Sequence, residues 1–209
     1  MANQIRRVAV LGAGVMGSGI AAHLANAGID SLLFDIVPPD ARESTDFKAR
    51  NAFALKGIET ARKIKPAAFM RASDARRITP CNYDDHGELL ASCDWIVEVV
   101  VERLDIKNKV FDWVEQHASP EAIVSSNTSG IPLADMAAQM SPALRKRFLI
   151  THFFNPVRYM RLLELVSGPD TDPAIVERIA AFGERRLGKG IVYGKDTACL
   201  LYTSDAADE

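Results

Sequence analysis

The sequence predicts an α/β fold: a doubly wound, mostly parallel sheet with a helical insertion after the second strand and an antiparallel end. Short apolar runs rich in β-branched residues alternate with stretches of helical spacing along most of the chain. A cluster of glycines separates the first run from the first helical stretch, and Asn155-Pro156 marks a turn after the last parallel run. Strands that alternate with helices favour a parallel sheet, because a helix provides the crossover between neighbouring parallel strands.

The first predicted unit is a strand, a helix and a second strand. These elements are Arg7–Leu11, Val15–Ala27 and Ser31–Phe34. Apolar residues recur at helical spacing through the middle element, and Gly28 then ends it, as glycine commonly does at a helix C-terminus. Asp35 closes the second strand, after which prolines at positions 38 and 39 break the pattern.

The remaining elements follow in the same alternation. A charged, helix-favouring stretch from Ala41 to Arg77 predicts a helical insertion that Pro66 interrupts. Apolar runs then predict three strands with helices between them: strands at Asp94–Val101, Ala122–Ser126 and Phe148–Phe153, and helices at Lys107–His117 and Leu133–Met140. Beyond Asn155-Pro156 we expect an antiparallel strand, a helix and a last strand, at Leu162–Val166, Pro173–Leu187 and Ile191–Tyr193.

Composition and charge exclude several classes of protein. The 209 residues are 48% apolar and 25% charged, which is ordinary for a soluble globular protein, and a net charge of −2 with scattered Lys and Arg gives no basic surface for nucleic acid. Cys81, Cys93 and Cys199 form no CxxC pair, so we expect no disulfide framework, no metal site and a cytoplasmic location. The uncharged run at 8–22 allows a signal peptide as an alternative, but a phosphate-binding turn explains its glycines better, and we expect no membrane span.

The glycine cluster has the pattern of a dinucleotide-binding turn. Gly12, Gly14 and Gly17 stand as GAGVMG directly after a predicted strand and at the start of a predicted helix, which makes the sheet Rossmann-like. Their roles would be a tight turn, close approach of the backbone to a pyrophosphate, and close packing of helix on strand. Asp35 follows Gly17 by 18 residues, where a carboxylate can bind both hydroxyls of an adenosine ribose, and this favours NAD over NADP. The motif alone leaves FAD open.

Of the four histidines, only His152 lies where an α/β sheet binds its ligands. It stands at the carboxyl end of a predicted strand, and Glu164 follows 12 residues later on the strand that returns. In a hairpin centred near Arg158 the two residues lie opposite each other, and the carboxylate can orient the imidazole as a general base. Without the glycine motif, a core histidine beside a cross-strand glutamate is an equally good interpretation.

Five segments match motifs of a known family. They read VAVLGAGVMGSGIA, VEVVVERLDIKNKVF, SSNTSGIPL, THFFNPVRYMRLLELV and LGKGIVYGKDT, and HFFNP followed by LLEL distinguishes the family from other GxGxxG dehydrogenases. From Arg6 to Thr197 the chain resembles the NAD-binding domain of the 3-hydroxyacyl-CoA dehydrogenases. Its motifs are most similar to those of bacterial multidomain fatty-acid oxidation enzymes. The resemblance implies NAD-dependent oxidation of a 3-hydroxyacyl-CoA to a 3-oxoacyl-CoA in fatty-acid β-oxidation.

The resemblance also implies roles for individual residues. The implied catalytic group is His152 with its partner Glu164, and Ser129 and Asn155 near the reacting oxygen. The implied cofactor contacts are Gly12, Gly14, Met16, Gly17, Asp35, Glu102, Lys107 and Asn127. The implied coenzyme A contacts are Arg62, Lys63 and Lys65. The residues alone leave alternatives: a capping and solvated-helix pair for Glu102 and Lys107, a helix cap for Ser129, and a solvated charged face for the three basic residues.

The resemblance stops after Thr197, so we divide the chain into an NAD-binding domain at 1–197 and a tail at 198–209 that matches nothing in the family. The family continues with an asparagine that polarises the substrate and a helical domain, which suggests a truncation here. We therefore expect NAD binding with poor turnover, and a homodimer only with the missing domain. The alternatives are a non-catalytic NAD-binding or redox-sensing module and a related 3-hydroxy-acid dehydrogenase, whose catalytic lysine would lie on a downstream helix.

Overall fold

The structure, a computed structural model that describes residues 4–196, is built on one sheet of eight strands in the order β3-β2-β1-β4-β5-β6-β7-β8. The strands are β1 Arg7–Leu11, β2 Asp30–Asp35, β3 Ile78–Asn82, β4 Trp95–Glu98, β5 Ile123–Ser126, β6 Phe148–Phe153, β7 Leu162–Ser167 and β8 Gly190–Gly194. Only β6 and β7 pair antiparallel, and every other neighbouring pair is parallel. The predicted doubly wound sheet with an antiparallel end is confirmed.

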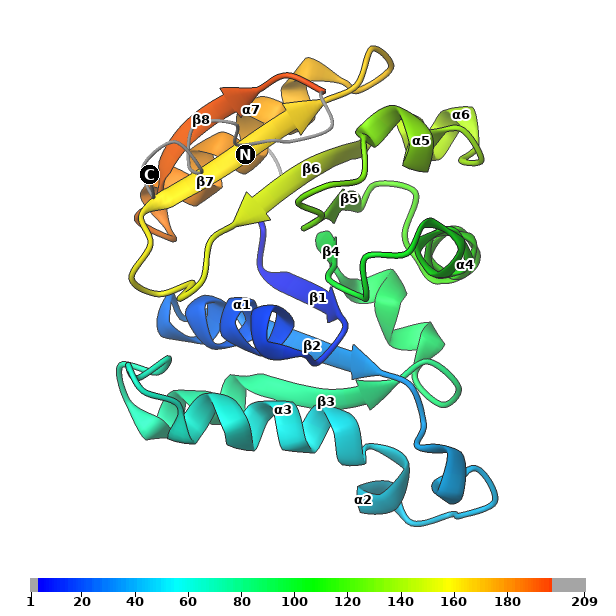
Figure 1. Ribbon diagram of the computed structural model, residues 1–209, viewed down its shortest axis with the longest axis vertical. Coiled ribbons are helices and arrows are strands. Elements are labelled where there is room, and N and C mark those ends of the chain that lie inside the picture. Colours follow the sequence, from blue (N-terminus) through cyan, green and yellow to red (C-terminus); the bar gives the residue numbers. More distant parts are fainter. Residues whose placement is uncertain (1–3, 197–209) are drawn as a thin grey trace, which may run out of the picture.

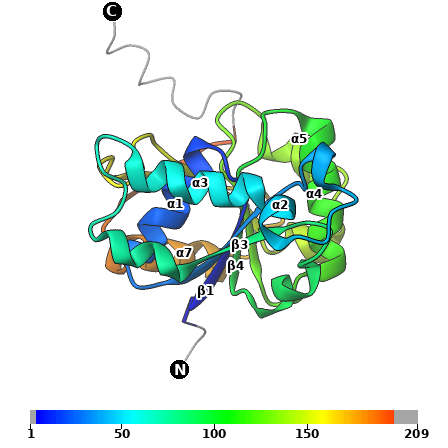
Figure 2. The ribbon, with the colours of Figure 1, turned by 90° about the horizontal axis from the view of Figure 1, so that it is seen from below.

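Helices cover both faces of the sheet (Figures 1 and 2). They are α1 Val15–Asn26, α2 Phe47–Arg50, α3 Ala52–Lys63, α4 Leu104–His117, α5 Leu133–Ala137, α6 Pro142–Arg145 and α7 Pro173–Arg185, with short 3-10 turns at η1 Pro39–Ala41, η2 Ala72–Arg77 and η3 Gly87–Ser92. Apolar residues of α1, α3 and α7 form one core with one face of the sheet, and residues of η3, α4, α5 and α6 form a second core with the other. Within the described part of the chain, no helix combines the length and hydrophobicity that a membrane crossing requires.

Two expectations about the elements were wrong, and one was confirmed. The strand β3 was not anticipated, since Pro80 lies within it; a proline is tolerated there because β3 is an edge strand and needs fewer backbone donors. The expected helical insertion at 41–77 is present as α2, α3 and η2, and the chain is not helical from 64 to 71, around the Pro66 expected to interrupt it. The third predicted strand ends at Glu98 rather than Val101, and α4 begins at Leu104, before the expected Lys107.

The topology decides where a site can lie. β1, β4, β5 and β6 run parallel, so their carboxyl ends, and the loops that follow them, meet at one edge of the sheet. The glycine cluster follows β1, and His152 is the last residue but one of β6. The two predicted functional segments therefore share one edge, although they are 135 or more residues apart in the sequence.

His23, on α1, is buried in the core beside the segment that connects α7 and β8. Its Nε2 lies 3.0 Å from the carbonyl oxygen of Leu187, and its Nδ1 has no hydrogen-bond partner among residues 4–196. Burial, and to a smaller extent the positive charges of Lys189 and Arg158, lower the pKa of His23 to about 4 even though the Leu187 carbonyl raises it. The imidazole is therefore neutral in the folded protein at neutral pH.

This lowered pKa predicts a loss of stability in acid. The unfolded chain binds a proton at His23 from about pH 6.5 downward, whereas the folded chain binds it only near pH 4, so stability falls as the pH falls through this window. Between pH 7.5 and pH 5 we expect the free energy of unfolding of the natural chain to fall by about 2 kcal/mol more than that of His23→Gln. Urea unfolding at the two pH values measures it, and equal losses in both proteins would contradict the assignment.

Candidate active site

The turn between β1 and α1 is shaped by two glycines that no other residue can replace. Gly12 has φ +118°, and a Cβ atom there would lie 2.5 Å from the carbonyl oxygen of Val99. A Cβ atom at Gly17 would lie 1.8 Å from the carbonyl oxygen of Gly12. Gly14 differs, because no atom lies within 4 Å of a Cβ built on it. The backbone at Gly14 thus faces open space, where a ligand can approach it closely.

The start of α1 is suited to an anion. Its N-cap is Gly14, its first turn holds no acidic residue, and no side chain within residues 4–196 caps it, so the positive end of the helix dipole is not neutralised there. Asp35, at the end of β2, accepts hydrogen bonds from the backbone N–H groups of Ala13 at 2.9 Å and of Ile36 at 2.7 Å. The carboxylate thereby fixes the glycine turn next to the end of β2. Met16, in the first turn of α1, is half-buried and packs against the core formed by α1, α3, α7 and the sheet.

The predicted hairpin brings His152 and Glu164 together. The two residues are register partners across β6 and β7, and His152 Nδ1 lies 3.3 Å from Glu164 Oε2. Both are buried, with 8% and 2% of their surface exposed. The other ring nitrogen, Nε2, lies 3.0 Å from Ser129 Oγ, in the loop that follows β5. One ring nitrogen is thus held by a carboxylate while the other faces the loop at the sheet edge.

Two asparagines lie in the segments that follow β5 and β6. Asn127 accepts a hydrogen bond from the backbone N–H of Phe153 at 2.9 Å through its Oδ1, so the loop after β5 is tied to the end of β6. Asn155 lies just beyond β6, and its side chain lines a cavity of about 520 Å³. Ser129 and His152 therefore meet between the loops after β5 and β6, and Asn155 follows β6 at the wall of the cavity.

A buried ion pair that the sequence interpretation did not anticipate lies beside this region. Glu98, at the end of β4, is fully buried, and Lys107 Nζ donates to both of its carboxylate oxygens at 2.8 and 2.9 Å. Glu98 also accepts from Ser126 Oγ. Lys107 is 1% exposed, which overturns the alternative of a solvated helix residue. A carboxylate within the apolar run DWIVEVVV was a usable signal, because a buried charge requires a partner.

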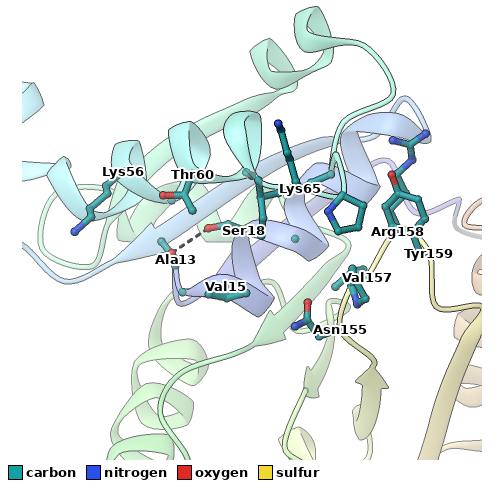
Figure 3. Close-up of a pocket in the computed structure, with 18 of the residues that line it drawn as sticks. Ala13, Val15, Ser18, Lys56, Thr60, Lys65, Asn155, Val157, Arg158 and Tyr159 are labelled. Carbon is teal, nitrogen blue, oxygen red and sulfur yellow. Dashed lines mark hydrogen bonds between the residues drawn. The ribbon is translucent and has the colours of Figure 1, made fainter.

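The cavity has a volume of about 520 Å³ and extends from the glycine turn to the β6–β7 turn (Figure 3). The exposed face of α3 forms one wall, and its polar residues there are Lys56 and Thr60, with Lys65 just beyond the helix. Arg158 lines the opposite end of the cavity from Lys56 (Figure 3). Three cationic side chains thus surround a largely apolar space.

Residues 7–197 match the family model of the NAD-binding domain of 3-hydroxyacyl-CoA dehydrogenase. This match covers well over half of the chain. The chain belongs to the 3-hydroxyacyl-CoA dehydrogenase family. The cofactor of this domain is NAD, which decides between the NAD and FAD alternatives that the glycine motif leaves open. The residues present fit this cofactor: backbone N–H donors at the uncapped helix start and the open backbone at Gly14 suit a diphosphate, and the Asp35 carboxylate can accept from a ribose.

Relatives and solved structures agree with this family. A probable 3-hydroxyacyl-CoA dehydrogenase of Bacillus subtilis is 48% identical over 205 residues, covering 94% of this chain and 26% of that protein. A putative fatty acid oxidation complex trifunctional enzyme of Rickettsia felis is 38% identical, again over 94% of this chain and 26% of that protein. The crystal structure of (S)-3-hydroxybutyryl-CoA dehydrogenase from Ralstonia eutropha has 30% identity and a TM-score of 0.72, covering 96% of this chain and 67% of that one. The chain spans about a quarter of the length of these two curated relatives.

Within this dehydrogenase domain, the basic residues chosen from the sequence are only partly those at the cavity. Lys65 lines it, whereas Arg62 and Lys63 are not among its lining residues and lie beside Glu59, with Lys63 Nζ 2.8 Å from a Glu59 oxygen. Lys56 was not chosen. A helical wheel would have found it, because the lining residues of α3 follow the spacing i, i+3, i+4, i+7: they are Phe53, Lys56, Gly57, Thr60, Ala61 and Ile64. Thr197 and the tail at 198–209 lie outside the described residues.

Proposed function

We propose that this chain supplies the cofactor site and the proton-transfer pair of an enzyme that oxidises 3-hydroxyacyl-CoA to 3-oxoacyl-CoA with NAD, in fatty-acid β-oxidation. The observation that carries the proposal is the pairing of His152 with Glu164 at the sheet edge that also holds the glycine turn. The name of the Rickettsia felis relative, a fatty acid oxidation complex, supports the pathway. The substrate class is supported by the 3-hydroxyacyl-CoA and 3-hydroxybutyryl-CoA dehydrogenases among the similar proteins.

The reaction removes a hydride and a proton from one secondary alcohol. NAD bound at the glycine turn and Asp35 would supply the acceptor for the hydride that leaves C3 of the substrate. His152 Nε2 takes the proton from the 3-hydroxyl group, and the C3–O bond becomes a carbonyl. Glu164 accepts a hydrogen bond from Nδ1–H, which fixes the tautomer and stabilises the imidazolium that forms. Ser129 Oγ, 3.0 Å from Nε2, is placed to donate to the same substrate oxygen.

The cavity beside α3 is suited to the coenzyme A part of the substrate. We assign Lys56, Lys65 and Arg158 to its phosphates, because these cations line the cavity while Arg62 and Lys63 face Glu59 instead. The apolar lining between them suits the pantetheine arm. Gly57 lets α3 approach the glycine turn, since a Cβ atom there would lie 2.7 Å from the carbonyl oxygen of Ala13. The cofactor and the thioester would therefore meet at the end of the cavity near Asn155.

The reverse reaction tests this function. Mixing NADH with an excess of the chain and of acetoacetyl-CoA should lower the NADH absorbance as 3-hydroxybutyryl-CoA forms. An excess of protein makes a single turnover measurable even if the steady-state rate is low. Binding of NADH without its oxidation, in the natural chain and in His152→Ala alike, would support a non-catalytic NAD-binding module instead.

A further inference from the structure

The loop between β5 and α5, residues 127–132, carries Ser129 and is held by one carboxylate from another part of the chain. Glu102 lies in the loop between β4 and α4, and its Oε1 accepts hydrogen bonds from the backbone N–H groups of Ser129 and Gly130, each at 3.0 Å. The hydroxyl of Thr128 donates to the same oxygen. Three donors of consecutive residues converge on one oxygen, so the conformation of the loop depends on Glu102.

The second carboxylate oxygen of Glu102 also has a charged partner. Oε2 lies 3.3 Å from Lys107 Nζ. Burial raises the pKa of Glu102, but the hydrogen bonds from Thr128, Gly130 and Ser129 and the charge of Lys107 together outweigh burial and hold the pKa below its ordinary value. The side chain is 44% exposed, and among the described residues Lys107 is the only partner of Oε2. Glu102 thus clamps the loop through Oε1, and this arrangement is compatible with a further contact at Oε2.

The other end of the clamp is fixed in the core. Lys107 Nζ is held by both oxygens of Glu98, and the two side chains are 1% and 0% exposed. Glu98 also accepts from the backbone N–H of Val100 at 2.6 Å and from Ser126 Oγ at 2.5 Å. A buried pair with every oxygen engaged is rigid, because separating the charges leaves one of them buried without a partner. Glu102 therefore reaches the loop from a fixed point.

We propose that Glu102 is a positioning residue that acts through Ser129: it holds the loop so that Ser129 Oγ stays at His152 Nε2, where the substrate oxygen reacts. This inference rests on the proposed function, because Ser129 matters only if His152 transfers the proton. It adds to the role that family resemblance implies for Glu102, a contact to the nicotinamide ribose, because the three loop donors all bind Oε1. The two roles separate in their effects: loss of a ribose contact weakens NADH binding, whereas loss of the clamp slows the chemical step.

A double-mutant cycle tests the clamp. We expect Ser129→Ala to lower the single-turnover rate of NADH oxidation about 100-fold, the typical effect of removing one preorganised donor, and Glu102→Ala to lower it about 10-fold. The double variant should be about as slow as Ser129→Ala alone, since no hydroxyl remains to be misplaced. Glu102→Gln keeps an amide oxygen for the backbone donors and should retain most of the rate. The NADH dissociation constant, measured by fluorescence, should change less than about twofold in Ser129→Ala, and its change in Glu102→Ala reports the ribose contact separately from the rate.

Control variants distinguish a failure of the clamp from a failure of the proposed function. Glu121→Ala removes an exposed carboxylate away from the loop and should leave the rate unchanged. Multiplicative effects in the double variant, or a clear loss of NADH affinity in Glu102→Ala with its rate retained, would overturn the clamp. If Glu102→Ala does not fold, as judged by circular dichroism, Glu102→Asp replaces it in the cycle, because the shorter side chain cannot reach all three donors. An unchanged rate in His152→Ala would instead overturn the proposed function.

Discussion

Replacing His152 with alanine should lower the single-turnover rate of NADH oxidation by acetoacetyl-CoA about 10²- to 10⁴-fold, the usual effect of losing a positioned general acid or base. In this direction the imidazolium donates the proton to the developing alkoxide. His86 also follows the carboxyl end of a strand, but that strand is β3, at the opposite side of the sheet from β6 and β7. NADH affinity should be unchanged, because the glycine turn lies on a different strand end. Stopped-flow absorbance and NADH fluorescence measure the two quantities.

Two further variants sharpen this prediction. Glu164→Gln keeps the shape of the side chain but not its charge, so it should also slow the reaction, since the neutral amide stabilises the imidazolium less. His86→Ala is the matched control: its Nδ1 accepts from the backbone N–H of Asn82, beyond the end of β3 and away from β6. A His152→Ala variant with nearly full activity would reassign the base.

Gly14→Ala should weaken NAD binding about 10- to 100-fold and leave thermal unfolding unchanged. The Cβ atom meets no protein atom within 4 Å, so the fold tolerates it, but it occupies the space through which a diphosphate approaches the start of α1. Forcing a methyl group into a packed contact costs about 1–3 kcal/mol, and this range gives the expected loss of affinity. Isothermal titration calorimetry with NAD and a thermal melt measure the two effects.

Gly17→Ala provides the contrast at the same turn. Its Cβ atom would lie 1.8 Å from the carbonyl oxygen of Gly12, so this variant should lose stability as well as NAD affinity. If Gly14→Ala instead binds NAD as tightly as the natural chain, the diphosphate does not approach the turn at this residue. A matching loss of stability in both variants would make Gly14 a structural glycine like Gly17.

The fold was largely predictable because its signals are local. The run Arg7–Leu11, the glycine spacing and the stop at Gly28 each correspond to an element boundary of the structure, and Gly28 has φ +77° at the end of α1. The strand β3 was missed because it depends on a tertiary fact: Pro80 is acceptable only at the edge of the sheet. No pattern within Ile78–Asn82 indicates that it will be an edge.

The site was predictable where strand register determines it. His152 and Glu164 are 12 residues apart around one turn, and a hairpin places them opposite each other. The clamp was not predictable in this way, since Glu102 and Ser129 lie in loops whose conformations no periodicity encodes. Glu98 shows the intermediate case: its burial follows from the apolar run around it, but its partner Lys107 is identified only when α4 is packed against β4.

In the proposed reaction, NAD held at the glycine turn exchanges a hydride with C3 of an acyl-CoA while His152 moves the proton. Isotope transfer tests this reaction: NADH with two deuterium atoms at C4 is mixed with excess chain and acetoacetyl-CoA, and the coenzyme A product is analysed by mass spectrometry. We expect 3-hydroxybutyryl-CoA carrying one deuterium at C3, formed about 10²- to 10⁴-fold more slowly by His152→Ala. Bound NADH with no deuterium in the product, or equal transfer by both proteins, would contradict it.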